Sequence, residues 1–252
     1  MNKQEFMEMH DEFAALVYSY ELFMKNGFLA DCKYNVTYFD ELRKVREAEA
    51  ELNILTAAMR DKGNKQITDI LNAIDNAKKN YAKELVATEN KNRYCKQLTS
   101  ILDRFDQSAF DASENNFRDF IFKYHPVVCL NAKKEAKDVY EMLKKFYFEC
   151  NYLGFQEYLE NNKQVFEADE ITEDRYVEAS QVYFRFRQTI NQSFINFKDK
   201  YPYNKKDLFK DEMTILSEKD DLIIKGKQLN EALKAARKDF KEAFGFDFKL
   251  VD

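Results

Sequence analysis

The stretch FMEMHDEFAALVYSYELF, residues 6–23, decides the fold class because its apolar side chains recur at the period of an α-helix. Alternating steps of three and four residues bring these side chains onto one helix face. The Asn26-Gly27 pair that follows is typical of a helix end, so we expect a first helix to stop there and a connection to run from Phe28 to Thr37. The stripe on this face consists of Phe6, Met9, Phe13, Leu16, Tyr20 and Phe23.

Two further segments repeat the pattern over residues 38–59 and 67–105, and Lys62-Gly63-Asn64 separates them. The second of these would form a helix about 60 Å long. Its polar middle leaves a break near Glu89–Arg93 open. Aromatic residues at core positions are too bulky for a two-stranded zipper, so we expect long antiparallel helices packed within the chain as a bundle or coiled-coil hairpin.

Glycine and proline are scarce, with 5 Gly and 2 Pro in 252 residues. So few turn-forming residues cannot supply a many-stranded sheet, nor the glycine loops that hold nucleotides. The fold class expected is therefore all-α, with few and short connections. Gly226 lies inside a helical stretch and predicts a bend or a boundary, whereas the others mark expected helix ends at Gly27, Gly63, Pro126, Gly154, Pro202 and Gly245.

Residues 106–116 form the most loop-like stretch, and we expect a domain boundary there. The predicted division is an N-terminal long-helix bundle over residues 1–110 and a compact helical C-terminal domain over residues 111–252. Whether the two pack as one unit stays open. Residues 117–135 and 194–207 share a Phe-x-x-Phe-x-x-Lys-Tyr pattern followed by a proline and a Lys-Lys-acid triplet, which either a duplicated helical hairpin or chance would produce.

Charge and cysteine usage narrow the class of protein. The net charge of −5 argues against a general nucleic-acid binder. The four cysteines have no metal-ligand spacing and indicate reduced thiols, so we expect a cytoplasmic location. No apolar run reaches the length of a membrane span, and no export signal is visible at the start of the chain. The abundance of residues with AT-rich codons suggests a low-GC bacterium or one of its phages.

Catalytic motifs are missing from the sequence. Histidine is the commonest general acid–base residue, and the chain has two. His10 is expected on a solvated helix face, and a His125–Cys129 pair is the single nucleophilic arrangement near in sequence. Acidic clusters could hold a cation, at Asp169-Glu170 with Glu173-Asp174 or at Asp220-Asp221. We expect no catalytic residue, cofactor or metal, and metal-assisted hydrolysis by carboxylates is a less favoured alternative.

Two surfaces are candidates for binding a macromolecule. Phe28, Tyr34 and Tyr38 could form an exposed aromatic contact patch or else cap the end of the bundle. We therefore expect a non-catalytic protein that binds and regulates another macromolecule through protein–protein contacts, as an inhibitor or adaptor would. A nucleic-acid-associated subunit is the alternative, because residues 183–187 interleave aromatics with arginines and a local basic excess occurs at Lys225, Lys227, Lys234, Arg237, Lys238 and Lys241.

Overall fold

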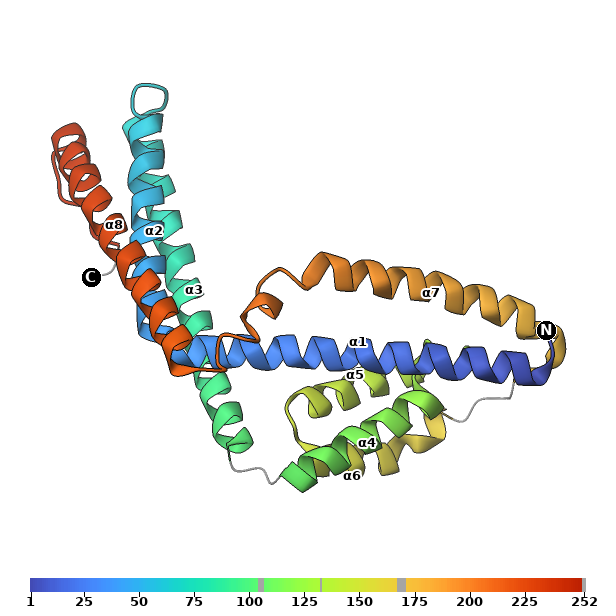
Figure 1. Ribbon diagram of the computed structural model, residues 1–252. Helices are drawn as coiled ribbons and strands as arrows, with labels where there is room; N and C mark the ends of the chain where they lie inside the picture. The colour runs from blue at the N-terminus through green and yellow to red at the C-terminus, as the bar shows by residue number, and fades with distance from the viewer. Residues whose placement is uncertain (104–106, 132, 167–170, 251–252) are drawn as a thin grey trace. The chain divides into compact units, whose positions relative to one another are not determined.

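The computed structural model describes residues 1–103, 107–131, 133–166 and 171–250. Every regular element in this part of the chain is helical, which confirms the all-α prediction (Figure 1). None of its helices is long and apolar enough to cross a membrane. The elements in order are α1 (Lys3–Thr37), α2 (Phe39–Asp61), α3 (Ile67–Leu102), α4 (Gln107–Tyr124), α5 (Lys134–Phe148), α6 (Tyr152–Asn162), η1 (Lys163–Phe166), η2 (Glu173–Arg175), α7 (Tyr176–Phe197), η3 (Tyr203–Lys205) and α8 (Glu212–Phe244).

The chain divides into two compact units, and two helices contribute to both. Unit 1 contains Met1–Asp31 and Leu98–Lys206, and unit 2 contains Cys32–Gln97 and Asp207–Asp252. This division differs from the expected boundary between residues 110 and 111. The long helices α1 and α3 continue from one unit into the other, and α8 joins the bundle of α2 and α3 rather than residues 111–206.

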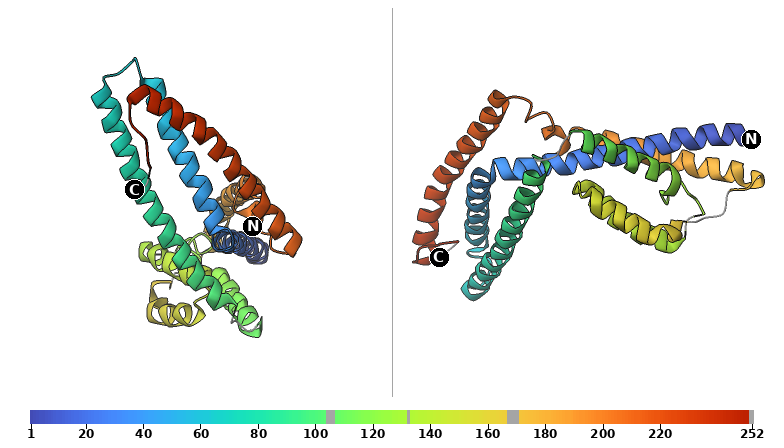
Figure 2. Two further views of the ribbon diagram at one scale, coloured as in Figure 1. Left: turned by 90° about the vertical axis from the view of Figure 1, so that its left-hand side faces the viewer. Right: turned by 90° about the horizontal axis from the view of Figure 1, so that it is seen from below.

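Unit 2 is built around α2, α3 and α8, which Figure 2 shows side by side. The short connection at Gly63 makes α2 and α3 antiparallel, as predicted, whereas α8 runs parallel to α2. Gly245 ends α8 in a left-handed conformation with φ 81°, and its N–H donates to the carbonyl of Lys241. The aromatic tail then returns to the core, as expected, because Phe248 and Leu250 are buried with Phe240.

In unit 1 the helices α1 and α7 run parallel (Figure 1). Aromatic residues seven positions apart on α1 contact aromatic residues seven positions apart on α7. Phe6 stacks on Tyr176 with ring centroids 4.3 Å apart, and Phe13 stacks on Tyr183 at 4.6 Å. The two helices can run parallel because α4, α5 and α6 lie between them in sequence, which lets the chain return to the start of α1 before α7 begins.

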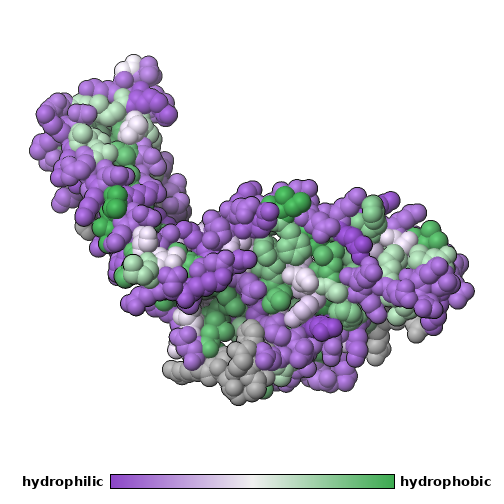
Figure 3. Space-filling model, viewed as in Figure 1, coloured by the Kyte–Doolittle hydropathy of each residue, from purple (hydrophilic) through white to green (hydrophobic). Residues whose placement is uncertain are grey.

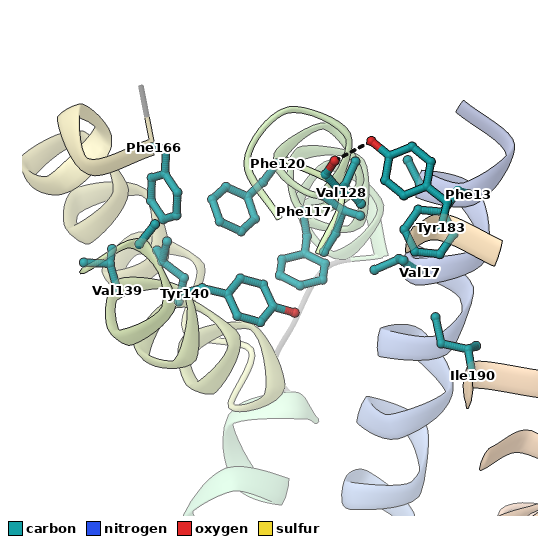
Figure 4. Packing of buried hydrophobic residues seen from close by; sticks show 14 of the residues in the cluster. Phe13, Val17, Phe117, Phe120, Val128, Val139, Tyr140, Phe166, Tyr183 and Ile190 are labelled. Atoms are coloured by element: carbon teal, nitrogen blue, oxygen red, sulfur yellow. Dashed lines mark hydrogen bonds between the residues drawn. The ribbon is translucent and has the colours of Figure 1, made fainter. Parts of the chain in front are cut away.

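The helices α4 and α5 complete the core of unit 1. Phe117 on α4 stacks on Tyr147 of α5 with centroids 3.5 Å apart. Phe120 packs edge-to-face on Phe166 at 5.4 Å. Figure 4 shows Phe117, Phe120 and Phe166 converging from separate segments on one interior, where aromatic side chains of this size bury a large apolar area.

The predicted helix end at Gly27 is wrong, because α1 continues to Thr37. Gly27 is buried inside the helix, and a Cβ atom there would lie 2.2 Å from Cε1 of Tyr203. This glycine therefore allows an aromatic ring to approach the helix backbone. Packing, and not a turn, therefore requires glycine at position 27.

Several other predicted boundaries are also changed by the structure. Within the expected loop over residues 106–116, residues 107–116 are helical in α4. Gly154 lies in the first turn of α6, where its N–H donates to the capping Asn151 side chain, and does not end α5. α3 continues through residues 89–93 and α8 continues through Gly226, whereas Pro126 does follow the end of α4 as predicted.

Candidate functional site

The aromatic residues predicted as an exposed contact patch are not exposed. Tyr34 and Tyr38 are buried with Leu208, and Phe28 is half-buried. The Tyr34 hydroxyl donates to Glu218 Oε1 at 2.6 Å, and burial raises the pKa of Tyr38 to about 12. Of the two alternatives for these residues, an exposed patch or a cap at the end of the bundle, the exposed patch is therefore wrong for Tyr34 and Tyr38. These tyrosines lie in the last turns of α1 and after it, where the sequence indicated a connection.

The predicted basic patch does lie along α8, but carboxylates pair with most of its charges. The strongest pair joins Arg237 to the buried Glu51, with both guanidinium–carboxylate contacts at 2.5 and 2.7 Å. Lys227 has no acidic partner among the described residues. These carboxylates lower the net positive charge of the face, and the nucleic-acid alternative stays a prediction. The remaining pairs are Lys225–Glu49 at 2.6 Å, Lys234–Glu231 at 2.8 Å, Lys238–Glu242 at 3.9 Å and Lys241–Asp247 at 3.0 Å.

The outer face of α7 carries an exposed apolar stripe, defined by Val177, Phe184 and Ile195. Their exposed fractions are 53%, 60% and 61%, and Figure 3 shows apolar surface among hydrophilic side chains over this helix. The three positions share a face, because separations of 7 and 11 residues are close to whole numbers of helical turns. The stripe is our candidate protein-binding surface, since large apolar side chains in solvent commonly mark interfaces.

The opposite face of α7 positions this stripe. Tyr176, Tyr183 and Ile190 are buried in the core of unit 1, and the Tyr183 hydroxyl donates to the carbonyl of Val128 at 2.7 Å (Figure 4). Helical spacing places Phe184 on a different face of α7 from the buried Tyr183. The interleaved aromatics and arginines of residues 183–187 suggested a surface on which nucleic-acid bases stack. Of these arginines, Arg187 forms an ion pair with Glu12 at 3.2 Å.

A buried polar cluster on α1 is the feature that the sequence pattern missed. Lys25 is completely buried, donates to Glu114 of α4 and lies 3.9 Å from the ring centroid of Tyr147. One turn earlier, Glu21 is buried and lies 2.8 Å from Lys144 of α5. The spacing of Val17, Glu21 and Lys25 continues a buried stripe, but charged residues at helical spacing are normally solvated, so the pattern gave no reason to place them inside.

His125 belongs to this cluster and not to a nucleophilic pair. Its Nδ1 accepts a hydrogen bond from the Val127 N–H at 3.1 Å, and its Nε2 lies 4.0 Å from Glu21 Oε1. Burial lowers the pKa of His125 below its usual value. The pKa of Glu21 is lowered despite its burial, because the nearby His125 ring and the hydrogen bond and charge of Lys144 favour the carboxylate. The cluster holds α1 against α4 and α5.

Cys129, the nucleophile nearest to His125 in sequence, does not contact the imidazole through its thiol. Its thiol donates to the carbonyl of Lys123 at 2.8 Å, and burial raises its pKa to about 11. A thiol that stays protonated at neutral pH is a poor nucleophile, so a His125–Cys129 pair is not supported. His10 is also not simply solvated, because its ring packs edge-on against Tyr183 with centroids 6.1 Å apart.

The described residues contain no group of three or more His, Cys, Asp or Glu side chains placed to hold a metal ion. Of the acidic clusters noted in the sequence, Asp169 and Glu170 lie outside the described residues. No protein-family model, curated protein or solved structure matches the chain. A proposal about function therefore depends on the chemistry of this chain's own surfaces.

Proposed function

We propose that this chain is a non-catalytic helical protein that binds another protein through the apolar stripe of α7. The observation that carries the proposal is the exposure of Val177, Phe184 and Ile195 on one face of a helix whose other face is anchored in the core. Complete burial of a fully exposed side chain of this kind contributes about 1.5–3 kcal/mol, and these side chains, which are a little more than half exposed, can gain about half of that. Aromatic anchors such as Phe184 are typical of the residues that dominate binding energy.

The chemistry of the stripe favours an amphipathic helix as the partner segment. Gln181, Gln188 and Asn191 are exposed on the same face, so the stripe is a narrow apolar seam with polar positions between the anchors. Arg185 is exposed beside Phe184, and no carboxylate pairs with it among the described residues. We expect the partner to supply apolar residues at helical spacing and an acidic residue opposite Arg185.

The test is affinity purification of the tagged chain from the cells that produce it, comparing the unchanged protein with Phe184→Asp and Ile195→Asp. Each substitution places a charge at the centre of the proposed interface. We expect the unchanged chain to recover a stoichiometric partner and the variants to bind it about thirtyfold more weakly or worse. Circular dichroism of each variant checks that the exposed substitutions leave the helices intact.

Met213→Asp is the matched control, because Met213 is an exposed apolar residue at the start of α8. This variant is expected to retain the partner. The assignment of the interface to α7 would be contradicted if Met213→Asp lost the partner as completely as Phe184→Asp does. It would also be contradicted if Phe184→Asp retained the partner fully. Recovery of no stoichiometric partner by the unchanged chain would contradict the function itself.

A further inference from the structure

The outer face of α8 in unit 2 carries large apolar side chains that are partly exposed. Leu216, Ile223 and Ile224 are 49%, 38% and 51% exposed, and Met213 near the start of the helix is 76% exposed. Separations of seven, eight and eleven residues bring these four side chains within about a third of the helix circumference. Leu233 lies on the inner side of α8 and is buried in the core of unit 2. Exposed apolar residues grouped in this way commonly mark an interface.

Two charged residues, Asp220 and Lys227, lie on the same face of α8. Asp220 comes one helical turn before the isoleucine pair of residues 223 and 224, and Lys227 comes one turn after it. Both side chains are exposed, and neither has an ion-pair partner in the part of the chain that the structure describes. The face therefore carries one unpaired charge of each sign, and the two charges are placed symmetrically about its apolar centre.

This symmetry makes the face complementary to a second copy of itself in the antiparallel direction. With a twofold axis between positions 223 and 224, Ile223 of one copy lies opposite Ile224 of the other, and Asp220 lies opposite Lys227 on both sides of the axis. In the parallel direction each residue lies opposite itself, so like charges meet. Sliding antiparallel copies by two turns also brings like charges together, either at Asp220 or at Lys227. Charge therefore selects one direction and one register.

We propose that a second copy of this chain binds the outer face of α8 and forms an antiparallel α8–α8 contact with twofold symmetry. The isoleucine pairs of the two copies form its apolar centre, and Leu216 extends it toward each end. Met213 lies beyond Leu216 at the end of the contact and contributes least. A single helix pair about 30 Å long is a small interface, so we expect a dissociation constant of about 10 µM. The α7 stripe takes no part in the contact, so this proposal does not depend on the proposed function.

Sedimentation velocity of the purified chain, with no other protein present, measures the dimer directly. The monomer has a mass of 30.0 kDa, and we expect a shift toward twice that mass between about 1 and 100 µM. Ile224→Asp places a charge at the apolar centre and should raise the dissociation constant about thirtyfold or more. Ile67→Asp is the matched control, because Ile67 is 56% exposed at the start of α3 in the same unit, and it should leave the dimer intact. Circular dichroism checks that both variants stay helical.

Charge reversal tests the direction and the register of the contact. Asp220→Lys alone sets positive charges opposite each other, and Lys227→Asp alone sets negative charges opposite each other. Each single change is expected to weaken self-association about tenfold. An equimolar mixture of the two variants should form a heterodimer, because every charge then meets its opposite on the other copy. Damage to the fold of one variant would not be repaired by adding the other.

Three outcomes would overturn the proposal: an unchanged chain that stays monomeric at every concentration, equal effects of Ile224→Asp and Ile67→Asp, or a mixture of the charge variants that stays monomeric. Phe184→Asp, on the α7 stripe, is expected to dimerise as the unchanged chain does. Loss of the dimer in this variant would assign self-association to α7 and would also overturn the contact on α8.

Discussion

The ammonium group of Lys25 on α1 is completely buried and donates a hydrogen bond to the carboxylate of Glu114 on α4. The second oxygen of Glu114 accepts hydrogen bonds from the hydroxyls of Tyr18 at 3.3 Å and Tyr147 at 2.5 Å. The carboxylate therefore has partners from α1 and α5 as well as its counter-ion. This arrangement fixes the position of α1 against the two helices that complete the core.

Lys25→Met is expected to lower the free energy of unfolding by about 3–5 kcal/mol, because it leaves the Glu114 carboxylate in the interior without its counter-ion. Adding Glu114→Gln to this variant should cost less than the sum of the two single changes, since the second removes the uncompensated charge. Urea denaturation measures all three proteins. The control is Lys163→Met, which breaks an exposed pair with Glu160 and should cost less than about 1 kcal/mol. Equal effects of the Lys25 and Lys163 changes would contradict the structural role of the buried pair.

Gly27→Ala and Gly226→Ala are expected to change stability in opposite directions. Both glycines lie inside α-helices, where alanine is favoured by about 1 kcal/mol. At Gly226 the nearest atom to a new Cβ is Val45 Cγ2 at 3.8 Å, an ordinary contact, so the variant should be more stable. At Gly27 the ring of Tyr203 is held by stacking on Phe23 with centroids 4.3 Å apart.

The clash at Gly27 should therefore exceed the helix propensity gained and lower stability by about 1–3 kcal/mol. Thermal unfolding of the two variants tests the pair. If Gly27→Ala stabilised the protein as much as Gly226→Ala, this result would contradict the close packing of Tyr203 against α1.

The buried His125 predicts a loss of stability in mild acid. Its pKa is lowered below the ordinary value of 6.5 in the folded protein, where Glu21, Lys144 and Glu141 are the charged groups around it. The unfolded chain therefore takes up a proton more readily, so the stabilising contribution is present above pH 6.5 and is lost as pH falls. The slope from one group is at most about 1.4 kcal/mol per pH unit.

His125→Gln should remove this slope between about pH 7 and pH 5, which denaturant titrations at a series of pH values measure. A second loss is expected below the ordinary Glu value of 4.5, because Glu21 has a lowered pKa in the folded state. The slope in mild acid would have another origin if His125→Gln left it unchanged.

Cys32 and Cys95 are both buried, and their sulfur atoms lie 3.0 Å apart. We predict that diamide, a thiol oxidant that takes up the two hydrogen atoms released, joins them as an intramolecular disulfide. Closing a loop of this length should stabilise unit 2 by about 4 kcal/mol in the chain-entropy model. Thiol titration in denaturant should fall from four free cysteines to two.

Cys32→Ser is expected to abolish this oxidation, whereas Cys129→Ser should leave it intact. Oxidation that yields cross-linked oligomers in place of a compact monomer, or that proceeds equally in Cys32→Ser, would contradict the pairing.

The helical elements themselves could be predicted from the sequence, because helix formation follows from local spacing. The apolar periodicity of residues 38–59 predicted α2, and the shortage of glycine and proline excluded sheets. The connection at Gly63 and the left-handed end of α8 at Gly245 were also predictable, since they depend on the conformational freedom of single residues.

The tertiary structure alone decided which faces are covered. Tyr38 and Phe184 are both aromatic residues in or beside a helix, yet Tyr38 is buried and Phe184 is exposed, because one faces Leu208 and the other faces solvent. Gly27 could not be recognised as a helix-interior residue without Tyr203, which is distant in sequence. Periodicity along one helix determines that a face is apolar, but the segment that packs on that face is selected by contacts between distant parts of the chain.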